Sequence, residues 1–132
     1  MGTEWRELTD GRQRMREDGI IEMRHSREVQ TLETIRRQME HAAELLQGRG
    51  RAPMMIVMGE VRGQTREARQ FLLSDPSIPR FVTRVAVVTR SPVSRVMATI
   101  FTRLVRPQVP FRVFGSEEQA LPWLREGLSI DG

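Results

Sequence analysis

Two spacings of apolar residues alternate along the chain and predict an α/β fold. Between Val29 and Gln47 the apolar residues recur every three or four positions, so they form one stripe along a helix. Short continuous apolar runs over Pro53–Met58 and Val82–Thr89 are typical of strands that are buried on both faces. Because helices and such strands alternate, we expect mostly parallel strand pairing with right-handed crossovers.

Capping residues mark the ends of the predicted helices in the middle of the chain. Thr65 offers a side-chain oxygen to a helix that reaches about Leu73 and is ended by Asp75-Pro76. Ser91-Pro92 places a capping hydroxyl and a first-turn proline at the start of a further helix, which ends before Pro107. Each of these helices follows one of the buried strands.

A short strand and a last helix are predicted at the C-terminal end. The strand covers Phe111–Phe114, and Ser116 with Gln119 then forms a capping box for a helix through Leu124. We expect Trp123 of this helix to fill the core beside the strand rather than to stack on a ligand.

The first 25 residues read as strands joined by turns. Asp18-Gly19 favours the tight turn of a β-hairpin. Ile21, Met23 and His25 share one face of its second arm, and Ile20, Glu22 and Arg24 share the other. We expect one of these two faces to be the core face. Trp5 lies before these strands and is expected either to pack on the sheet edge or to be exposed.

Length and composition narrow the class of protein. The 132 residues fit one α/β domain over residues 1–132, with residues 1–10 and 126–132 expected to be poorly ordered. The chain is 39% hydrophobic and 29% charged, and no apolar run approaches the roughly 20 residues that span a bilayer. Cysteine is absent and no apolar leader opens the sequence, so we expect a cytoplasmic location.

The positive charge is concentrated in one segment. All 21 cationic residues are arginines, and the formal net charge is +4. Residues 76–116 contain seven of these arginines and no Asp or Glu, whereas the remaining 14 arginines are outnumbered by 17 acidic residues. An external anionic surface would explain this segment. The exclusive use of arginine can also reflect genomic base composition alone.

Arg90, Ser91 and Arg95 form the candidate anion- and partner-binding site. They lie at the start of a predicted helix, where acidic residues are usual because the helix dipole is positive there. Arg95 is expected to project away from the apolar stripe and to reach a carboxylate or phosphate, and Arg112 would extend the site. The alternative is that Arg95 is solvated or paired with a glutamate of a neighbouring loop.

No group of residues indicates catalysis, a cofactor or a metal. The two histidines, at positions 25 and 41, are separated along the chain, and the absence of cysteine argues against zinc. No nucleophile elbow, phosphate-binding loop or dinucleotide fingerprint occurs. An enzyme is therefore the least favoured class. Nucleic acid is also a disfavoured partner, because aromatic residues are only 5% of the chain.

Several residues of the C-terminal half carry a resemblance to a known family. They are Ala86-Val87-Val88, Ser91-Pro92, Arg95, Phe101, Pro110, Arg112, Phe114, Ala120 and Trp123-Leu124. This pattern resembles the small bacterial SpoIIAA-like proteins of the STAS superfamily, in element order over Met15–Leu124 and most specifically from Arg84 onward. The resemblance implies an N-terminal β-hairpin that leads into a mixed, mostly parallel sheet with about four helices packed on it.

The resemblance also implies a regulatory role. The best-known members, the anti-sigma-factor antagonists, bind a kinase-like partner and are switched by phosphorylation of a serine at a helix start. Their Asp-Ser pair is missing from residues 59–65 here, and Thr65 stands roughly in the place of that serine, close to Arg62 and Arg66. A phosphate on Thr65 would be favoured by the helix N-terminus. The alternative is that Thr65 only caps the helix.

These observations lead to two functional hypotheses. We favour a non-enzymatic interaction module that docks an acidic protein surface, as the resemblance to the antagonists implies, and we leave open whether the chain forms a homodimer. The alternative is a binding protein or sensor for a small anionic or lipid ligand held between a helix and the sheet. Met54, Met55, Met97 and Phe101 would then be wall residues.

Overall fold

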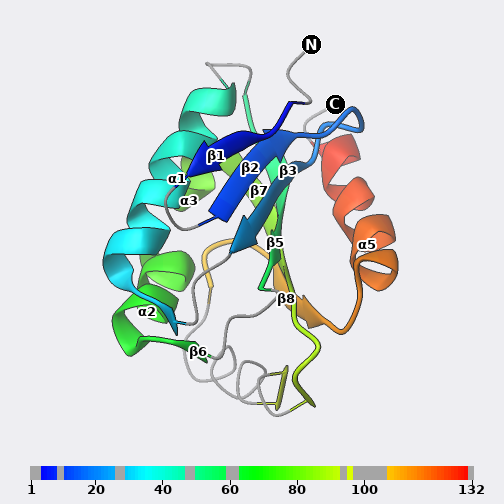
Figure 1. Cartoon of the computed structure of the whole chain (residues 1–132). Helices are drawn as coiled ribbons and strands as arrows, with labels where there is room; N and C mark the ends of the chain where they lie inside the picture. Colours follow the sequence, from blue (N-terminus) through cyan, green and yellow to red (C-terminus); the bar gives the residue numbers. More distant parts are fainter. Residues whose placement is uncertain are drawn as a thin grey trace.

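The computed structural model of the chain describes residues 4–8, 11–25, 29–46, 50–58, 63–92, 95–96 and 107–130. Six strands form one sheet in the order β1-β2-β3-β5-β7-β8 (Figure 1). They are β1 (Arg6–Leu8), β2 (Gly11–Met15), β3 (Ile21–His25), β5 (Ala52–Val57), β7 (Val82–Val88) and β8 (Phe111–Phe114). The first three pair antiparallel, and β3, β5, β7 and β8 pair parallel. The predicted mixed sheet with an N-terminal hairpin is confirmed.

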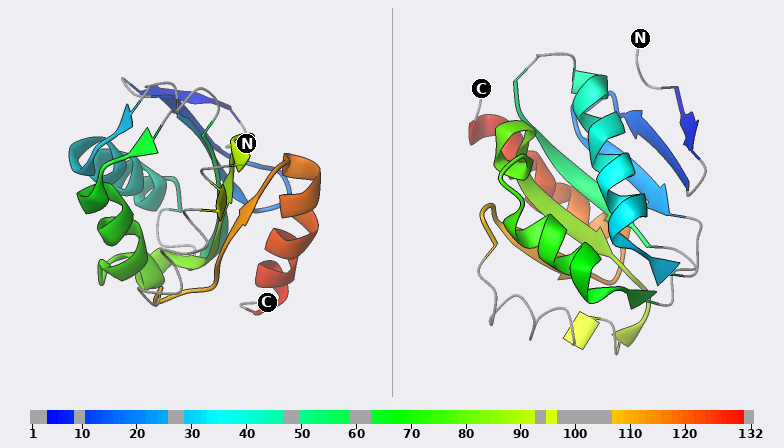
Figure 2. Two further views of the ribbon diagram at one scale, coloured as in Figure 1. Left: turned by 90° about the horizontal axis from the view of Figure 1, so that it is seen from below. Right: turned by 90° about the vertical axis from the view of Figure 1, so that its left-hand side faces the viewer.

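Helices cover both faces of this sheet (Figure 2). On one face lie α1 (Leu32–Leu46), α2 (Arg66–Ser74) and α3 (Ile78–Phe81), and α5 (Glu117–Ile130) lies on the other. A separate pair of two-residue parallel strands, β4 (Val29–Gln30) and β6 (Gly63–Gln64), precedes α1 and α2. Most of the helix predicted after Ser91 lies outside the described residues.

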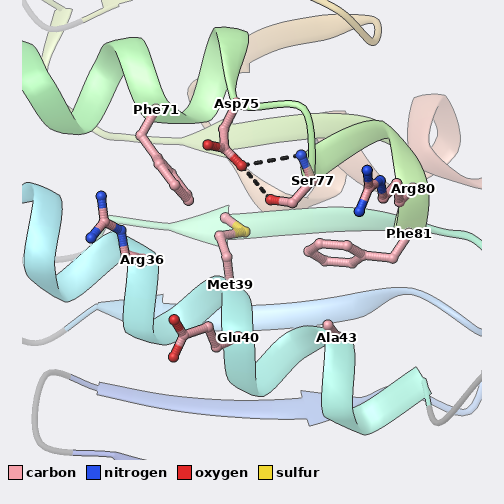
Figure 3. A pocket seen from close by; sticks show the side chains of 9 residues that line it. All are labelled: Arg36, Met39, Glu40, Ala43, Phe71, Asp75, Ser77, Arg80 and Phe81. Atoms are coloured by element: carbon pink, nitrogen blue, oxygen red, sulfur yellow. Dashed lines mark hydrogen bonds between the residues drawn. The ribbon is translucent and has the colours of Figure 1, made fainter.

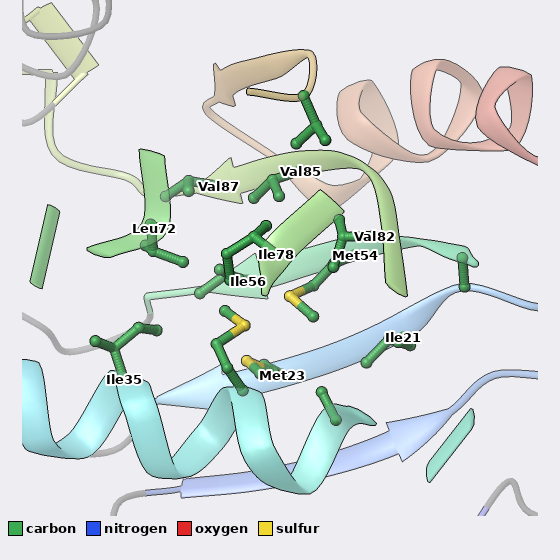
Figure 4. Packing of buried hydrophobic residues seen from close by; sticks show 14 of the residues in the cluster. Ile21, Met23, Ile35, Met54, Ile56, Leu72, Ile78, Val82, Val85 and Val87 are labelled. Atoms are coloured by element: carbon green, nitrogen blue, oxygen red, sulfur yellow. The ribbon is translucent and has the colours of Figure 1, made fainter. Parts of the chain in front are cut away.

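The sheet therefore has two hydrophobic cores. The larger one packs β3, β5 and β7 against α1, α2 and α3, with Ile21, Met54 and Ile56 fully buried at its centre (Figure 4). The smaller one lies under α5 and includes Ile20 and Met55. Each fully buried side chain of this size contributes about 2 kcal/mol of hydrophobic stabilisation. The central strand predicted over Pro53–Met58 is confirmed, since every residue of β5 is buried.

The predicted hairpin is confirmed, but its second arm is buried on both faces. The Arg16 N–H donates to the Ile20 carbonyl at 2.9 Å across the turn, in which Gly19 has a φ of 86°. Ile20 and Glu22 on one face have no exposed surface, and Ile21 and Met23 on the other face are buried as well. The expectation of a single core face was wrong because α5 covers the second face.

Two of the predicted helices begin at their predicted caps. The Thr65 hydroxyl accepts a hydrogen bond from the Ala68 N–H at 3.2 Å, and the Ser116 hydroxyl accepts one from the Gln119 N–H at 3.3 Å. The last helix runs to Ile130, beyond its predicted end at Leu124.

The first helix begins later than its periodicity predicted. Val29 and Gln30 form β4, and α1 starts at Leu32. The Thr31 hydroxyl accepts a hydrogen bond from the Thr34 N–H at 3.3 Å, while the Thr34 hydroxyl accepts one from the Thr31 N–H at 2.9 Å. This reciprocal cap fixes the helix start, because it satisfies donors that have no partner within the helix.

Candidate functional site

The ends of three parallel strands meet at one edge of the sheet. The Met58 N–H donates to the Val88 carbonyl at 2.9 Å, and the Thr89 N–H donates to the Phe114 carbonyl at 3.0 Å, so the ends of β5, β7 and β8 are tied together. We call residues 58, 89–92, 95–96 and 115–116 the carboxyl-terminal edge; it lies at the lower end of the molecule in Figure 1. In open α/β sheets, ligands bind outside the carboxyl ends of the strands, at a point where the strand order reverses.

The candidate residues Ser91 and Arg95 form hydrogen bonds and packing contacts within this edge. The Ser91 carbonyl accepts the first helical hydrogen bond from the Arg95 N–H at 3.1 Å, as predicted for an N-cap residue. The Arg95 guanidinium donates to the Thr89 carbonyl at 3.0 Å and lies against Gly115, where an added Cβ would stand 3.0 Å from its Nη1 atom. Arg95 therefore connects the ends of β7 and β8, and it does not project freely outward as expected.

The outward-facing residues of the edge are a cation and two apolar side chains. Arg90 and Pro92 are exposed, and Val96 is 58% exposed, the most exposed large hydrophobic residue in the described part of the chain. Arg112 is also exposed but lies beside the edge, on the face that α5 covers. Its guanidinium carbon stands 5.2 Å from the ring centroid of Phe114, a cation–π arrangement.

Thr65 occupies the position that the sequence assigned to it, at the start of α2. It is half-buried and caps the helix, and Arg66 next to it is exposed. Arg62 lies outside the described residues. The cap is thus confirmed, while phosphorylation of Thr65 stays a prediction.

The arginines that the structure describes in residues 76–116 lie on different faces of the sheet. Arg80 lies at the end of α3, on the face of the sheet that α1 covers, whereas the Arg84 guanidinium on the opposite face donates to the Trp123 carbonyl at 2.9 Å. Arg84 also lies 3.5 Å from the Glu126 carboxylate. Only part of the positive charge of the segment is therefore available at the carboxyl-terminal edge.

A buried charge cluster lies where the hairpin meets α5. Glu22 has no exposed surface, and its carboxylate oxygens stand 2.9 Å from Arg14 Nε, 3.4 Å from Arg16 Nη1 and 2.7 Å from Arg24 Nη2. Arg24 extends the cluster to Glu117 of α5 at 2.6 Å. The alternation of arginines at positions 12, 14 and 16 is the sequence signal for this cluster, which was not predicted.

Two further side chains adjoin this cluster. Burial would raise the pKa of the Asp18 carboxyl, but hydrogen bonding to Arg16 and its positive charge outweigh burial and hold that pKa below its usual value. The ring of Trp5 packs beneath two guanidinium groups, with its centroid 4.2 Å from Arg12 Cζ and 4.4 Å from Arg14 Cζ. Trp5 therefore packs on the strands of the hairpin, which was one of the two expected outcomes.

A groove of about 580 Å³ lies between α1, α2 and α3 (Figure 3). Its residues are Arg36, Met39, Glu40, Ala43, Phe71, Asp75, Ser77, Arg80 and Phe81. No sequence pattern indicated this groove, because α3 was not predicted. The wall residues that were expected for a ligand site are placed elsewhere: Met54 and Met55 are fully buried in the two different cores, so they cannot line one cavity. Met97 and Phe101 lie outside the described residues.

The two histidines lie apart in the structure. His25 is buried at the end of β3, and His41 of α1 lies 3.5 Å from the Glu44 carboxylate. Within the described ranges, no three His, Asp or Glu residues gather closely enough to hold a metal ion. No helix in those ranges has the length and apolar character that crossing a membrane requires.

The chain matches a family model and is similar to a solved structure. A family model described as a domain of unknown function, DUF7793, matches residues 14–127. The structure of an uncharacterised protein of the DUF3478 family with a SpoIIAA-like fold, from Shewanella loihica PV-4, is similar with a TM-score of 0.54 and 16% identity, over 92% of this chain and 90% of that one. The predicted SpoIIAA-like fold is therefore confirmed.

A second solved structure is similar at a lower TM-score. The structure of a protein of unknown function from Arthrobacter sp. FB24 is 27% identical over 90% of this chain and 95% of that one, with a TM-score of 0.35. No curated protein matches the chain.

Proposed function

The chain belongs to the DUF7793 family, and from this premise we propose that it is a non-enzymatic interaction module that docks an acidic protein partner at its carboxyl-terminal edge. The SpoIIAA-like fold supports an interaction role only by analogy, since folds host many functions. The proposal therefore depends on the residues of the edge itself. It includes no cofactor and no catalytic group, and it assumes a cytoplasmic setting.

The observation that carries the proposal is the placement of exposed Arg90 beside exposed Pro92 and Val96. Protein interfaces combine an apolar centre with surrounding polar groups, and arginine is enriched in them. Arg95 holds the underlying loop by donating to the Thr89 carbonyl, so little conformational entropy needs to be lost on binding. The exposed cation indicates that the partner presents carboxylates here.

The experiment compares two double variants that have the same net charge. Arg90→Gln with Arg112→Gln removes the exposed cations at and beside the edge. Arg37→Gln with Arg125→Gln removes two exposed cations of α1 and α5 that lie elsewhere. Each protein is immobilised and incubated with native lysate at low and at moderate salt. Retained proteins are quantified by mass spectrometry, and the affinity of the most enriched one is then measured.

We expect the edge double variant to bind roughly tenfold more weakly at low salt, because each exposed ion pair contributes at most about 1 kcal/mol. The difference should narrow at moderate salt, where exposed charges are screened. Equal weakening of both double variants would mean that net charge alone drives binding and would refute a docking edge. If the retained protein is a second copy of this chain, the proposal of an acidic partner is wrong and the edge is instead a homodimer interface.

A further inference from the structure

The groove between α1, α2 and α3 has the composition of a small-molecule site. Its volume of about 580 Å³ is within the range of roughly 300–1,000 Å³ that is usual for ligand pockets. Phe71 and Phe81 reach into it from α2 and α3, and the buried side chain of Met39 lies between them on α1 (Figure 3). These three side chains provide apolar walls on three separate helices.

Two arginines at the groove retain unused hydrogen-bonding capacity. Among the described residues, the guanidinium groups of Arg36 and Arg80 form no hydrogen bond or ion pair. Arg36 lies four residues before Glu40, a spacing that allows an ion pair, but its Cζ atom instead lies 5.9 Å from the ring centroid of Phe71. A ligand can therefore receive charged hydrogen bonds here without displacing an existing partner.

The acidic residues of the groove restrict the charge of that ligand. Asp75 is already engaged, because its carboxylate accepts hydrogen bonds from the Ser77 N–H at 3.1 Å and from the Ser77 hydroxyl. Together with Glu40 it still places negative charge at the rim, which disfavours a doubly charged group such as a phosphate monoester. A single carboxylate suits the planar fork of one guanidinium group.

We propose that this groove binds a small amphipathic monocarboxylate. The carboxylate pairs with Arg80, and the apolar part packs against Phe71, Phe81 and Met39. This site is separate from the carboxyl-terminal edge and does not depend on the docking proposed there. Binding at the groove can therefore succeed or fail independently of partner docking.

The test is a titration of ¹⁵N-labelled full-length chain with decanoate below its micellar concentration, followed by NMR. Decan-1-ol, decyl phosphate and decyltrimethylammonium serve as probes with the same chain and a different head group. Arg80→Gln removes the proposed carboxylate partner, and Arg37→Gln is the matched control on an exposed face of α1. Ala43→Phe fills the groove from a position that is exposed on α1, so the core stays intact.

We expect saturable shifts of the amide signals of Phe71, Ser77 and Phe81 with decanoate. Arg80→Gln should weaken binding about tenfold, which is the effect of losing one charge-assisted hydrogen bond. Arg37→Gln should leave binding unchanged, and Ala43→Phe should abolish it. The proposal is overturned if the alcohol, the phosphate or the ammonium compound binds as well as decanoate. It is equally overturned if the signals of the groove do not shift, or if Arg80→Gln and Arg37→Gln behave alike.

Discussion

The buried carboxylate of Glu22 is the residue whose removal we expect to reveal most about how this fold is stabilised. It accepts hydrogen bonds from the Nε atoms of Arg14 and Arg24, each at 2.9 Å, and from Arg16 Nη1 at 3.4 Å. In Glu22→Gln the side chain keeps its size, but the charge is lost and an amide NH₂ replaces one acceptor. Donors would then face donors within the cluster.

The size of the effect follows from the burial of the partners. Removing one member of a fully buried ion pair typically costs about 3–5 kcal/mol, because a charge is left without compensation. Here the three arginine side chains are 20–32% exposed and can regain some hydration. We therefore expect Glu22→Gln to lower the free energy of unfolding by about 3 kcal/mol. For a chain of this length that corresponds to a decrease in Tm of roughly 10 °C.

Urea unfolding followed by tryptophan fluorescence and by circular dichroism would measure this loss. The matched control is Glu33→Gln, which removes an 80% exposed carboxylate that also pairs with an arginine, Arg37, at 2.8 Å. That change should cost less than about 0.5 kcal/mol, as exposed i,i+4 pairs do. If the two variants lose the same stability, the argument that burial determines the worth of Glu22 is wrong.

Four further predictions concern stability and binding. The pKa of Asp18 is lower in the folded than in the unfolded state, so its carboxylate stabilises the fold above the unfolded-state pKa of about 4. This stabilisation is lost as the pH falls through the folded-state pKa. The free energies of unfolding of the wild type and Asp18→Asn, measured by urea titration, should therefore converge in acid. Thr65→Ala should cost about 1 kcal/mol and Thr65→Ser almost nothing in the same titration. If Thr65 is a phosphorylation switch, Thr65→Glu should change the affinity for the captured partner while Thr65→Ser does not. Ile56→Ala should cost about 2–5 kcal/mol, and exposed Val96→Ala less than about 0.5 kcal/mol, in thermal unfolding.

Local sequence signals predicted most of the helices and strands, because residues close together in the sequence determine where such an element forms and where it begins. The continuous apolar run over Pro53–Met58 is typical of a strand that is buried on both faces, and the hydroxyls of Thr65 and Ser116 fix helix starts within one turn. The start of α1 was misplaced for the same reason, since Val29 continues the apolar period although Thr31 provides the cap. The apolar period alone does not distinguish a helix that begins at Val29 from one that begins after Thr31.

The candidate sites were predicted less well because they depend on contacts between distant segments. The groove needs α1, α2 and the four-residue α3 to pack together, and no local pattern predicts that packing. The direction of Arg95 depends on the carbonyl of Thr89, which becomes available only where β7 ends. The sequence pointed to the segment that carries Arg90 as a candidate site, which stays a prediction, and it did not show how the arginines of that segment divide between the two faces of the sheet.

The covering of one sheet face by α5 has a consequence for the order of folding. Arg24 and Glu117, which join the hairpin to that helix, are 93 residues apart in the chain. During synthesis, the apolar side chains of Ile20 and Met55 therefore stay exposed to solvent until α5 has left the ribosome and can pack on them. A nascent chain that is halted before Glu117 would expose the hydrophobic sheet face that α5 normally covers. We expect such a chain to bind chaperones and to aggregate.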